Sequence, residues 1–232
     1  MTIEDKKLTI GDTTVDLLSA DDTFSFRCTK CGKCCKDRED VLLNPYDVFR
    51  IAKYLGEEVE DILQTYTKCH IGATSRMPVV VIRPSGKRRT CPFLTKQQCR
   101  IQEAKPSVCA LFPLGRLGDG DGDILYILQP ISCGKQDESH TVQEWLAEHN
   151  LEDSEEWFHI WYDAMLSLGT RVREIEPYMS EPLFEKLEET IFRLLYPGYN
   201  LNEPFIPQAK QKLTKVDDLL TSIEKILDVQ EK

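Results

Sequence analysis

The sequence predicts an α+β fold that is mostly helical, with a cysteine-rich metal-binding unit followed by a helical C-terminal region. All nine cysteines lie between residues 28 and 133, among short apolar runs and turn signals that predict small strands and hairpins. After Gly134 the cysteines stop, and apolar residues recur at helical spacing. We therefore expect an N-terminal hairpin (1–23), a cysteine-cluster metal-binding domain (24–136), and a helical region packed on or beside it (137–232).

Strand signals are apolar runs bounded by turn residues, and they fall at 7–18 (around Gly11-Asp12), 78–83 and 124–128. The run at 78–83 is followed by the turn Pro84-Ser85-Gly86. We expect it to form a hairpin with the stretch that ends in 91–94. Such a hairpin would carry Cys91 to the metal site, and the strand at 124–128 would lead toward Cys133.

Helix signals come from capping residues and periodicity. Asn44, with Pro45 at the first helical position, predicts a helix through Leu55 that Gly56 ends, and a short helix follows at 57–66. In the C-terminal region the expected helices are TVQEWLAEH with a capping box of Thr141 and Glu144, a longer helix capped by Ser154, and helices at 182–196 and 207–229. The aromatic residues Trp157, Phe158 and Trp161 of the longer helix are expected in the core.

The formal net charge is −10, but the sign changes along the chain. Basic residues surround the cysteines: Arg27, Lys30, Lys33, Lys36, Arg38, Lys87, Arg88, Arg89, Lys96, Arg100 and Lys105. Cations stabilise a centre whose thiolates leave it negative, and they lower thiol pKa values. From Asp137 onward acidic residues predominate, and we expect a protein partner to contact this acidic helical half. Without a stacking platform or a recognition-helix motif, we expect no nucleic-acid partner.

The N-terminal sequence MTIEDKKLTI has no apolar signal-peptide core, and nowhere do about eighteen apolar residues follow one another. We therefore expect a cytoplasmic protein that does not enter a membrane. In a reducing compartment, clustered cysteines bind metals or do redox work more often than they form structural disulfides.

The run Cys28-Thr29-Lys30-Cys31-Gly32-Lys33-Cys34-Cys35 is the strongest functional signal. Three cysteines at this spacing place thiolates on one curved loop, and Gly32 lets the loop bend. The remaining ligands are expected from the dispersed cysteines, Cys91, Cys99, Cys109 and Cys133. The alternative is a redox role in which Cys28 with Cys31, or Cys34 with Cys35, cycles as a disulfide.

These segments closely resemble the YkgJ-like cysteine-cluster proteins, a family named for its CxxCxxCC motif. Besides residues 26–35, the resemblance rests on Cys91-Pro92-Phe93-Leu94, Cys99-Arg100-Ile101 and the segment 105–113. It covers about residues 24–134, and Lys105 stands where the family usually has Arg. The resemblance implies a domain that chelates zinc or iron, and some longer relatives are linked to methylation of flagellin lysines. Spacing and resemblance agree on one ligand set: Cys28, Cys31, Cys34, Cys35, Cys91, Cys99, Cys109 and Cys133.

Eight thiols are enough for two centres. We expect Cys34 and Cys35 to serve different centres, or one of them to bridge two metals, because adjacent cysteines seldom point both sulfurs at one ion. Cys28, Cys31 and Cys34 with one dispersed cysteine would form the first centre, and Cys35 with the other three the second. Thiolates suit iron and zinc alike. The single spacing of the later cysteines favours an iron–sulfur cluster over zinc, whose knuckles use paired C-x-x-C units.

Three functions stay open: a structural or electron-transfer metal module, an enzyme related to flagellin lysine N-methylases, and a metal carrier or sensor. The sequence has no Gly-rich loop after a strand and no nucleophile with an adjacent base, so it identifies no catalytic residue.

Weaker candidates are expected to be structural. Cys69-His70 is interpreted as a surface helix end, and His140, His149 and His159 are not expected to be ligands. The segment 119–123 is interpreted as a hairpin turn rather than a calcium loop, since Ile124 and Pro130 replace the glycine and glutamate that such a loop requires.

Overall fold

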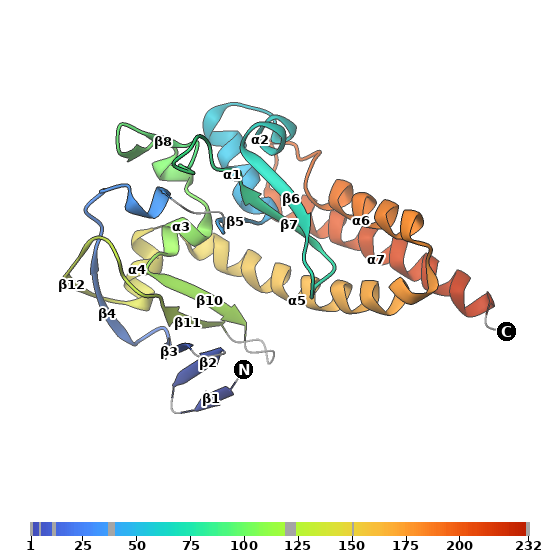
Figure 1. Ribbon diagram of the computed structural model, residues 1–232, viewed down its shortest axis with the longest axis horizontal. Helices are drawn as coiled ribbons and strands as arrows, with labels where there is room; N and C mark the ends of the chain where they lie inside the picture. The colour runs from blue at the N-terminus through green and yellow to red at the C-terminus, as the bar shows by residue number, and fades with distance from the viewer. Residues whose placement is uncertain are drawn as a thin grey trace. The chain divides into compact units, whose positions relative to one another are not determined.

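A computed structural model describes residues 2–4, 6–10, 13–36, 40–118, 124–149 and 151–230. The chain forms two compact units, and each unit joins two separate stretches (Figure 1). The first unit comprises 1–41 and 84–159, and the second comprises 42–83 and 160–232. The predicted α+β class, mostly helical, is confirmed. Each unit combines segments from more than one of the three predicted regions, 1–23, 24–136 and 137–232. The division of the chain into these three domains stays a prediction.

The first unit contains most of the strands. Its elements are β1 (Thr2–Glu4), β2 (Lys7–Ile10), β3 (Thr13–Leu18), β4 (Thr23–Arg27), η1 (Lys33–Cys35), β8 (Leu94–Thr95), β9 (Gln98–Cys99), η2 (Gln102–Ala104), α3 (Ser107–Leu111), β10 (Leu114–Gly118), β11 (Ile124–Leu128), β12 (Lys135–Thr141), α4 (Val142–Glu148) and the start of α5 (Glu152–Ile175). Five strands form a sheet in the order β1-β2-β3-β11-β10. The antiparallel pair β2–β3 confirms the strand pair at 7–18, whose turn at Gly11-Asp12 lies outside the described residues. Strand β11 confirms the strand at 124–128.

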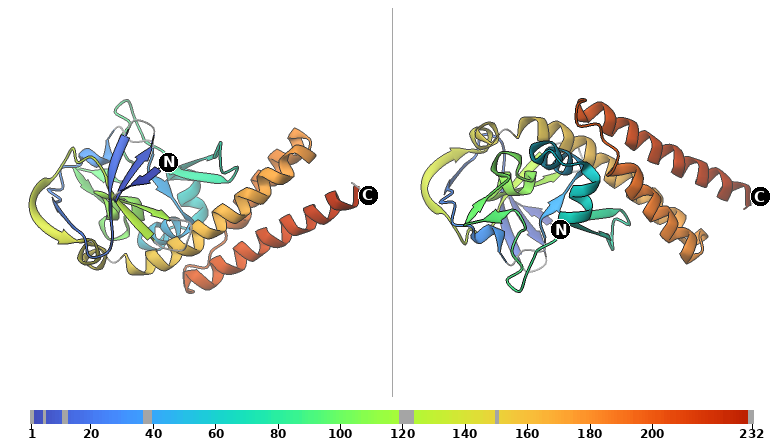
Figure 2. Two further views of the ribbon diagram at one scale, coloured as in Figure 1. Left: turned by 90° about the horizontal axis from the view of Figure 1, so that it is seen from below. Right: turned by 90° about the horizontal axis from the view of Figure 1, so that it is seen from above.

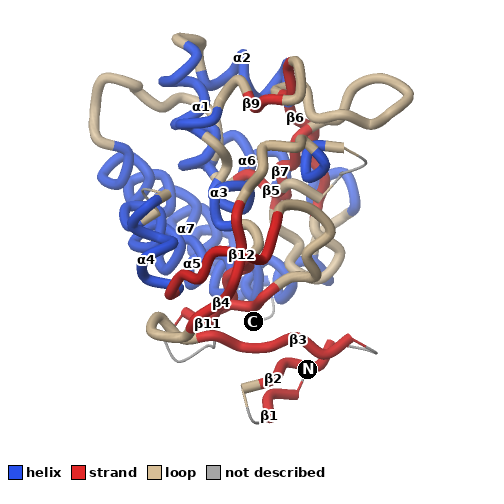
Figure 3. Tube along the Cα trace, turned by 90° about the vertical axis from the view of Figure 1, so that its left-hand side faces the viewer, coloured by secondary structure: helices blue, strands red, loops and turns tan. Residues whose placement is uncertain are grey.

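Strands β4 and β12 form a separate antiparallel ribbon that the sequence does not predict (Figure 3). Its register places Lys135 opposite Arg27 and Thr141 opposite Thr23. The helical region was expected at 137–232, and the polar segment 135–141 at its start forms β12, which pairs with β4. The capping box of Thr141 and Glu144 is confirmed at the start of α4.

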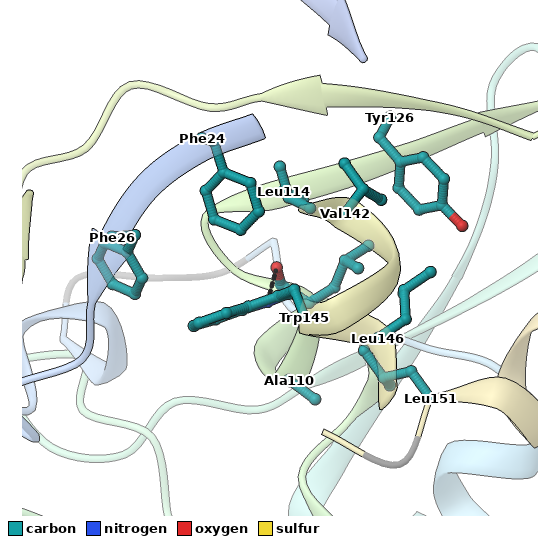
Figure 4. Close-up of a cluster of buried hydrophobic side chains, with 10 residues drawn as sticks. Phe24, Phe26, Ala110, Leu114, Tyr126, Val142, Trp145, Leu146 and Leu151 are labelled. Atoms are coloured by element: carbon teal, nitrogen blue, oxygen red, sulfur yellow. Dashed lines mark hydrogen bonds between the residues drawn. The ribbon is translucent and has the colours of Figure 1, made fainter. Parts of the chain in front are cut away.

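The core of the first unit gathers around Trp145 (Figure 4). The indole Nε1 donates a hydrogen bond to the Leu111 carbonyl at 3.1 Å, which ties α4 to α3. Phe24 and Phe26 of β4 meet the indole edge-on, with ring centroids 5.5 and 5.8 Å away. Edge-to-face pairs of this kind contribute about 0.5–1.5 kcal/mol beyond their buried area. This core fixes the strand that leads into the cysteine loop and the helix that carries Cys109.

The second unit consists of helices and one small sheet. Its elements are β5 (Leu42–Leu43), α1 (Pro45–Leu55), α2 (Val59–Tyr66), β6 (Thr67–Ile71), β7 (Pro78–Ile82), the rest of α5, η3 (Glu176–Tyr178), α6 (Glu181–Leu195) and α7 (Phe205–Gln230). The Asn44 cap and the Gly56 end of α1 are confirmed, and Gly56 has φ +67°. Helix α2 starts at Val59, two residues later than expected.

The hairpin predicted from 78–83 into 91–94 is wrong. Strand β7 is the central strand of a three-stranded sheet and pairs with β5 and β6 on its two sides. The segment that follows it, 84–90, makes two isolated bridges, Ser85 with Thr90 and Lys36 with Thr90. An apolar run predicts a buried strand without predicting its partners.

Ser154 was expected to be the N-cap of the longer helix, and this expectation is wrong because α5 begins at Glu152. Ser154 is buried, and its hydroxyl donates to the Leu151 carbonyl at 2.8 Å while accepting from Arg116 at 2.9 Å. Trp157 is buried, as expected, with 1 % of its surface exposed.

Helices α6 and α7 confirm the two predicted C-terminal helices, and α7 turns back in direction after α6 (Figure 2). Arg171 of α5 donates to Glu224 and Asp217 of α7 at 2.7 and 2.6 Å. Within the described ranges, the chain contains no helix that is both long and apolar enough to cross a membrane.

Candidate metal centre

Seven cysteines line one cavity in the first unit. The cavity has a volume of about 150 Å³. Its thiols come from Cys28, Cys31, Cys34, Cys35, Cys99, Cys109 and Cys133. None of the nine cysteines forms a disulfide. The fold therefore brings together cysteines that are up to about a hundred residues apart in the sequence.

The cysteine loop leaves β4 at Arg27, which forms ion pairs with Asp137 and Glu138 of β12. Gly32 has φ +67°, which places it in the left-handed region before η1, and the Cys35 amide donates to the Gly32 carbonyl at 3.3 Å. A Cβ at Gly32 would lie 3.3 Å from Leu94. Glycine at this position therefore meets two needs, the positive φ and the close approach of β8.

The dispersed cysteines approach this loop from separate elements. The Cys91 amide donates to the Cys35 carbonyl at 2.9 Å, which anchors Cys91 at the edge of the cavity although it does not line it. Cys99 lies on β9, opposite Leu94 in the β8–β9 hairpin. Cys109 lies on α3, the helix that Trp145 holds through its hydrogen bond to Leu111.

Cys133 is held by its neighbour Gly134, which has φ +76°. A Cβ at Gly134 would lie 2.5 Å from the Phe26 ring and 2.7 Å from the Arg27 carbonyl oxygen. The backbone of Gly134 also hydrogen-bonds Cys31. Close packing at Gly134 thus fixes Cys133 against the loop of Cys28 and Cys31.

The thiols differ in their electrostatic surroundings. The backbone N–H of Lys33 lowers the pKa of Cys31, with smaller contributions from Thr29 and Gly134. Burial raises the pKa values of Cys91 and Cys99, and burial together with Cys34 and Cys31 raises the pKa of Cys133 to about 11. Since a thiol must lose its proton to bind a metal, these shifts make binding at the buried thiols compete with protons.

The sulfurs of Cys34 and Cys35 lie 4.0 Å apart. The hydrogen bond to Cys34, followed by burial and the nearby Cys91 and Cys109, raises the pKa of Cys35. Two thiolates on one tetrahedral zinc ion lie about 3.8 Å apart, given Zn–S bonds of about 2.3 Å. The spacing of this pair therefore suits a shared ion, and its division between two centres stays a prediction.

Across the described part of the chain, no three His, Cys, Asp or Glu side chains converge closely enough to hold one metal ion. The thiols instead surround a space. The donor set still fits a metal group, because thiolates are soft ligands that select zinc and iron–sulfur clusters.

Basic residues were expected to surround the cysteines, and the cavity has positive charge on its lining. Lys30 and Lys105 line the thiol cavity. Lys105 and Arg100 also lower the pKa of Cys99, against the larger effect of burial. Among the predicted cations, Arg38 lies outside the described residues.

One histidine lies on the cavity wall. His149 follows α4, and its Nδ1 lies 2.9 Å from the Trp145 carbonyl oxygen. Burial lowers its pKa. The expectation that His140, His149 and His159 are not ligands stays a prediction, and no signal in the sequence indicated that His149 lies at the cavity.

Two weaker candidates lie elsewhere. Cys69 and His70 are on β6 of the second unit, so the interpretation as a helix end is wrong. Both are exposed. Residues 119–123, interpreted as a turn, lie outside the described residues.

A cavity lined by seven cysteine thiols, with an eighth at its edge and cations around it, is typical of a cysteine-rich metal-binding protein. Comparison with known families makes this assignment specific. Residues 27–144, just over half of the chain, match the CxxCxxCC family, described as "Putative zinc- or iron-chelating domain". The chain belongs to this family, which confirms the resemblance seen in the sequence. No curated protein and no solved structure matches the chain.

Proposed function

We propose that the protein is a metal-binding module of the cytoplasm whose thiol cavity holds an iron–sulfur cluster in a structural or electron-transfer role. The size of the cavity is the observation that carries the proposal. One water-sized site needs roughly 10–15 Å³ of such space, so the cavity of about 150 Å³ has room for a group of several atoms.

The arrangement of the thiols supports the same proposal. A single zinc ion takes four donors, whereas seven thiols line the cavity. A cluster places its metal atoms apart, and each one takes its own thiolates. When bound, such a cluster would supply one-electron chemistry or a rigid cross-link between the segments that carry Cys28, Cys109 and Cys133.

The charges around the site are consistent with this role. Lys30 and Lys105 line the cavity and would offset the negative charge of a thiolate-bound cluster. An acidic helical half, 137–232, would contact the protein partner that exchanges electrons or depends on the module. Nine cysteines without a disulfide fit a reducing compartment.

The experiment is an anaerobic purification in which iron, zinc and acid-labile sulfide are quantified per chain, together with the visible absorption spectrum. We expect iron with matching sulfide and a broad absorption band. The matched variants are Cys109→Ser, inside the cavity, and Cys69→Ser, in the other unit. Iron and sulfide should fall in the first variant and stay at the parent level in the second. A colourless protein that contains zinc without sulfide would overturn the cluster.

A metal carrier or sensor is the second candidate, because Cys28 and Cys34 are exposed thiols. Exposed ligands allow a competing chelator to attack the metal directly. A carrier should lose its metal to a chelator while the far-ultraviolet circular dichroism stays constant, whereas a structural centre should unfold as the metal leaves.

A further inference from the structure

A second, more open depression adjoins the thiol cavity. It has a volume of about 450 Å³ and shares Thr29, Cys31, Cys133 and Gly134 with the thiol cavity. Small-molecule sites typically measure about 300–1,000 Å³. The depression therefore has the size of a ligand site, and Cys31 and Cys133 line both it and the thiol cavity.

The walls of the depression are cationic and polar. Lys33 and Lys135 contribute two ammonium groups, while Thr29, Ser132 and Gln136 contribute hydrogen-bonding side chains. No acidic residue lines it among the residues that the structure describes. The nearest acidic residues along the chain, Asp137 and Glu138, form ion pairs with Arg27.

The negative charge of the thiolates does not by itself explain why Lys33 and Lys135 lie at the depression. The thiol cavity has its own cations, Lys30 and Lys105, whereas Lys33 and Lys135 line only the depression. Both are exposed, and neither lies within ion-pair distance of a described carboxylate, although the charge of Lys135 makes a small contribution to the lowered pKa of Asp137. Their neighbouring backbone positions are fixed, since Lys33 begins η1 after Gly32 and Lys135 pairs with Arg27.

We propose that this depression binds a small oxyanion, either a dicarboxylate or phosphate, beside Cys31 and Cys133. Lys33 and Lys135 hold the anionic oxygens by charge-assisted hydrogen bonds, and the hydroxyl and amide groups of Thr29, Ser132 and Gln136 orient them. The site is defined by these side chains and does not depend on which metal occupies the thiol cavity.

The test is isothermal titration calorimetry of the purified, metal-containing protein at 0.15 M salt, with succinate in one arm and inorganic phosphate in the other. Neither probe is a strong chelator, and the metal content is measured before and after each titration. We expect saturable binding of at least one probe. The tighter of the two identifies the source of the oxyanion.

The variant Lys33→Gln/Lys135→Gln should weaken that binding by about tenfold or more, because two charge-assisted hydrogen bonds are lost. The matched control Lys7→Gln/Lys87→Gln removes the same charge from exposed lysines of the same unit that line neither cavity. It should change binding less than about twofold, since distant exposed charges are screened at this salt concentration.

Binding is located by the amide chemical shifts of Ser132 and Gln136, which should move on titration. Failure of both probes to bind, or equal weakening in the two double variants, would overturn the proposal. If the parent binds no oxyanion and Lys33→Gln/Lys135→Gln loses metal, the two lysines instead compensate the negative charge of the thiolates. None of these outcomes changes the metal and sulfide content of the parent protein, so this proposal and the proposed function fail separately.

Discussion

Replacing Gly134 by alanine tests how the fold holds Cys133 against the cysteine loop. Gly134 has φ +76°, and an added Cβ would lie 2.7 Å from the Arg27 carbonyl oxygen and 2.5 Å from the Phe26 ring. Neither neighbour can move freely. Arg27 ends β4 in the β4–β12 ribbon, and Phe26 is buried with 2 % of its surface exposed.

The expected loss of stability has two parts. Alanine in a left-handed conformation costs about 1–2 kcal/mol. Forcing a methyl group into packed surroundings costs about 1–3 kcal/mol more. Gly134→Ala should therefore lower the free energy of unfolding by about 2–5 kcal/mol, less about 0.4–1 kcal/mol because alanine also restricts the unfolded chain.

Gly86→Ala is the matched control. Gly86 belongs to the same unit and has φ +68°, but an added Cβ would meet nothing within 4 Å. The backbone cost and the unfolded-state effect are therefore shared, and the difference between the two variants reports the close contact alone. We expect that difference to be about 1–3 kcal/mol.

The assay is urea unfolding under reducing, anaerobic conditions, followed by circular dichroism, with the metal content of each sample measured beforehand. Gly134→Ala should also retain less metal than Gly86→Ala, because the clash displaces the segments that carry Cys28 and Cys133. Equal unfolding free energies for the two variants, to within about 0.5 kcal/mol, would refute the reasoning, since the contact at Gly134 would then carry no energetic weight.

Three further predictions follow from single contacts. Thr141→Ala removes the hydroxyl that accepts from the Glu144 amide at 3.1 Å, and the midpoint of thermal unfolding should fall by the equivalent of about 1 kcal/mol. Cys99→Ser should lower the metal content of the purified protein, while Cys69→Ser should leave it unchanged; elemental analysis compares the two. The guanidinium of Arg171 lowers the pKa of Glu224, so this pair stabilises the fold above the ordinary glutamate pKa of 4.5, and the stabilisation is lost as the pH falls through the lowered value. Arg171→Leu should therefore be less stable than the parent at neutral pH, and the gap measured by urea unfolding should narrow on acidification.

Local signals predicted the helices well. Asn44 and Thr141 start helices because each side chain accepts a hydrogen bond from a backbone amide three residues later. Gly56 ends α1 because it adopts positive φ. Ser154 shows the limit of such signals. It has a capping side chain, but the helix already begins at Glu152, and the buried hydroxyl of Ser154 interacts with Leu151 and Arg116 instead.

Strand pairing was harder to predict because it depends on partners far away in the sequence. The apolar run of β7 was recognised, but its partners β5 and β6 were not. Strand β12, KQDESHT, has no apolar alternation and is mostly exposed, so its sequence gives no strand signal. It becomes a strand because β4, more than a hundred residues earlier, offers it an edge.

The same dependence on distant pairing explains the candidate site. The spacing from Cys28 to Cys35 marks a local loop, and a sequence can reveal such a loop directly. Cys99, Cys109 and Cys133 reach the cavity from β9, from α3 and from the segment before β12. Trp145 of α4 meets β4 at Phe24 and Phe26 and also donates to Leu111 of α3, so one core residue supports both sides of the cavity. Because the ligands are assembled by tertiary structure, metal binding and the folding of the first unit are thermodynamically linked, and each should stabilise the other.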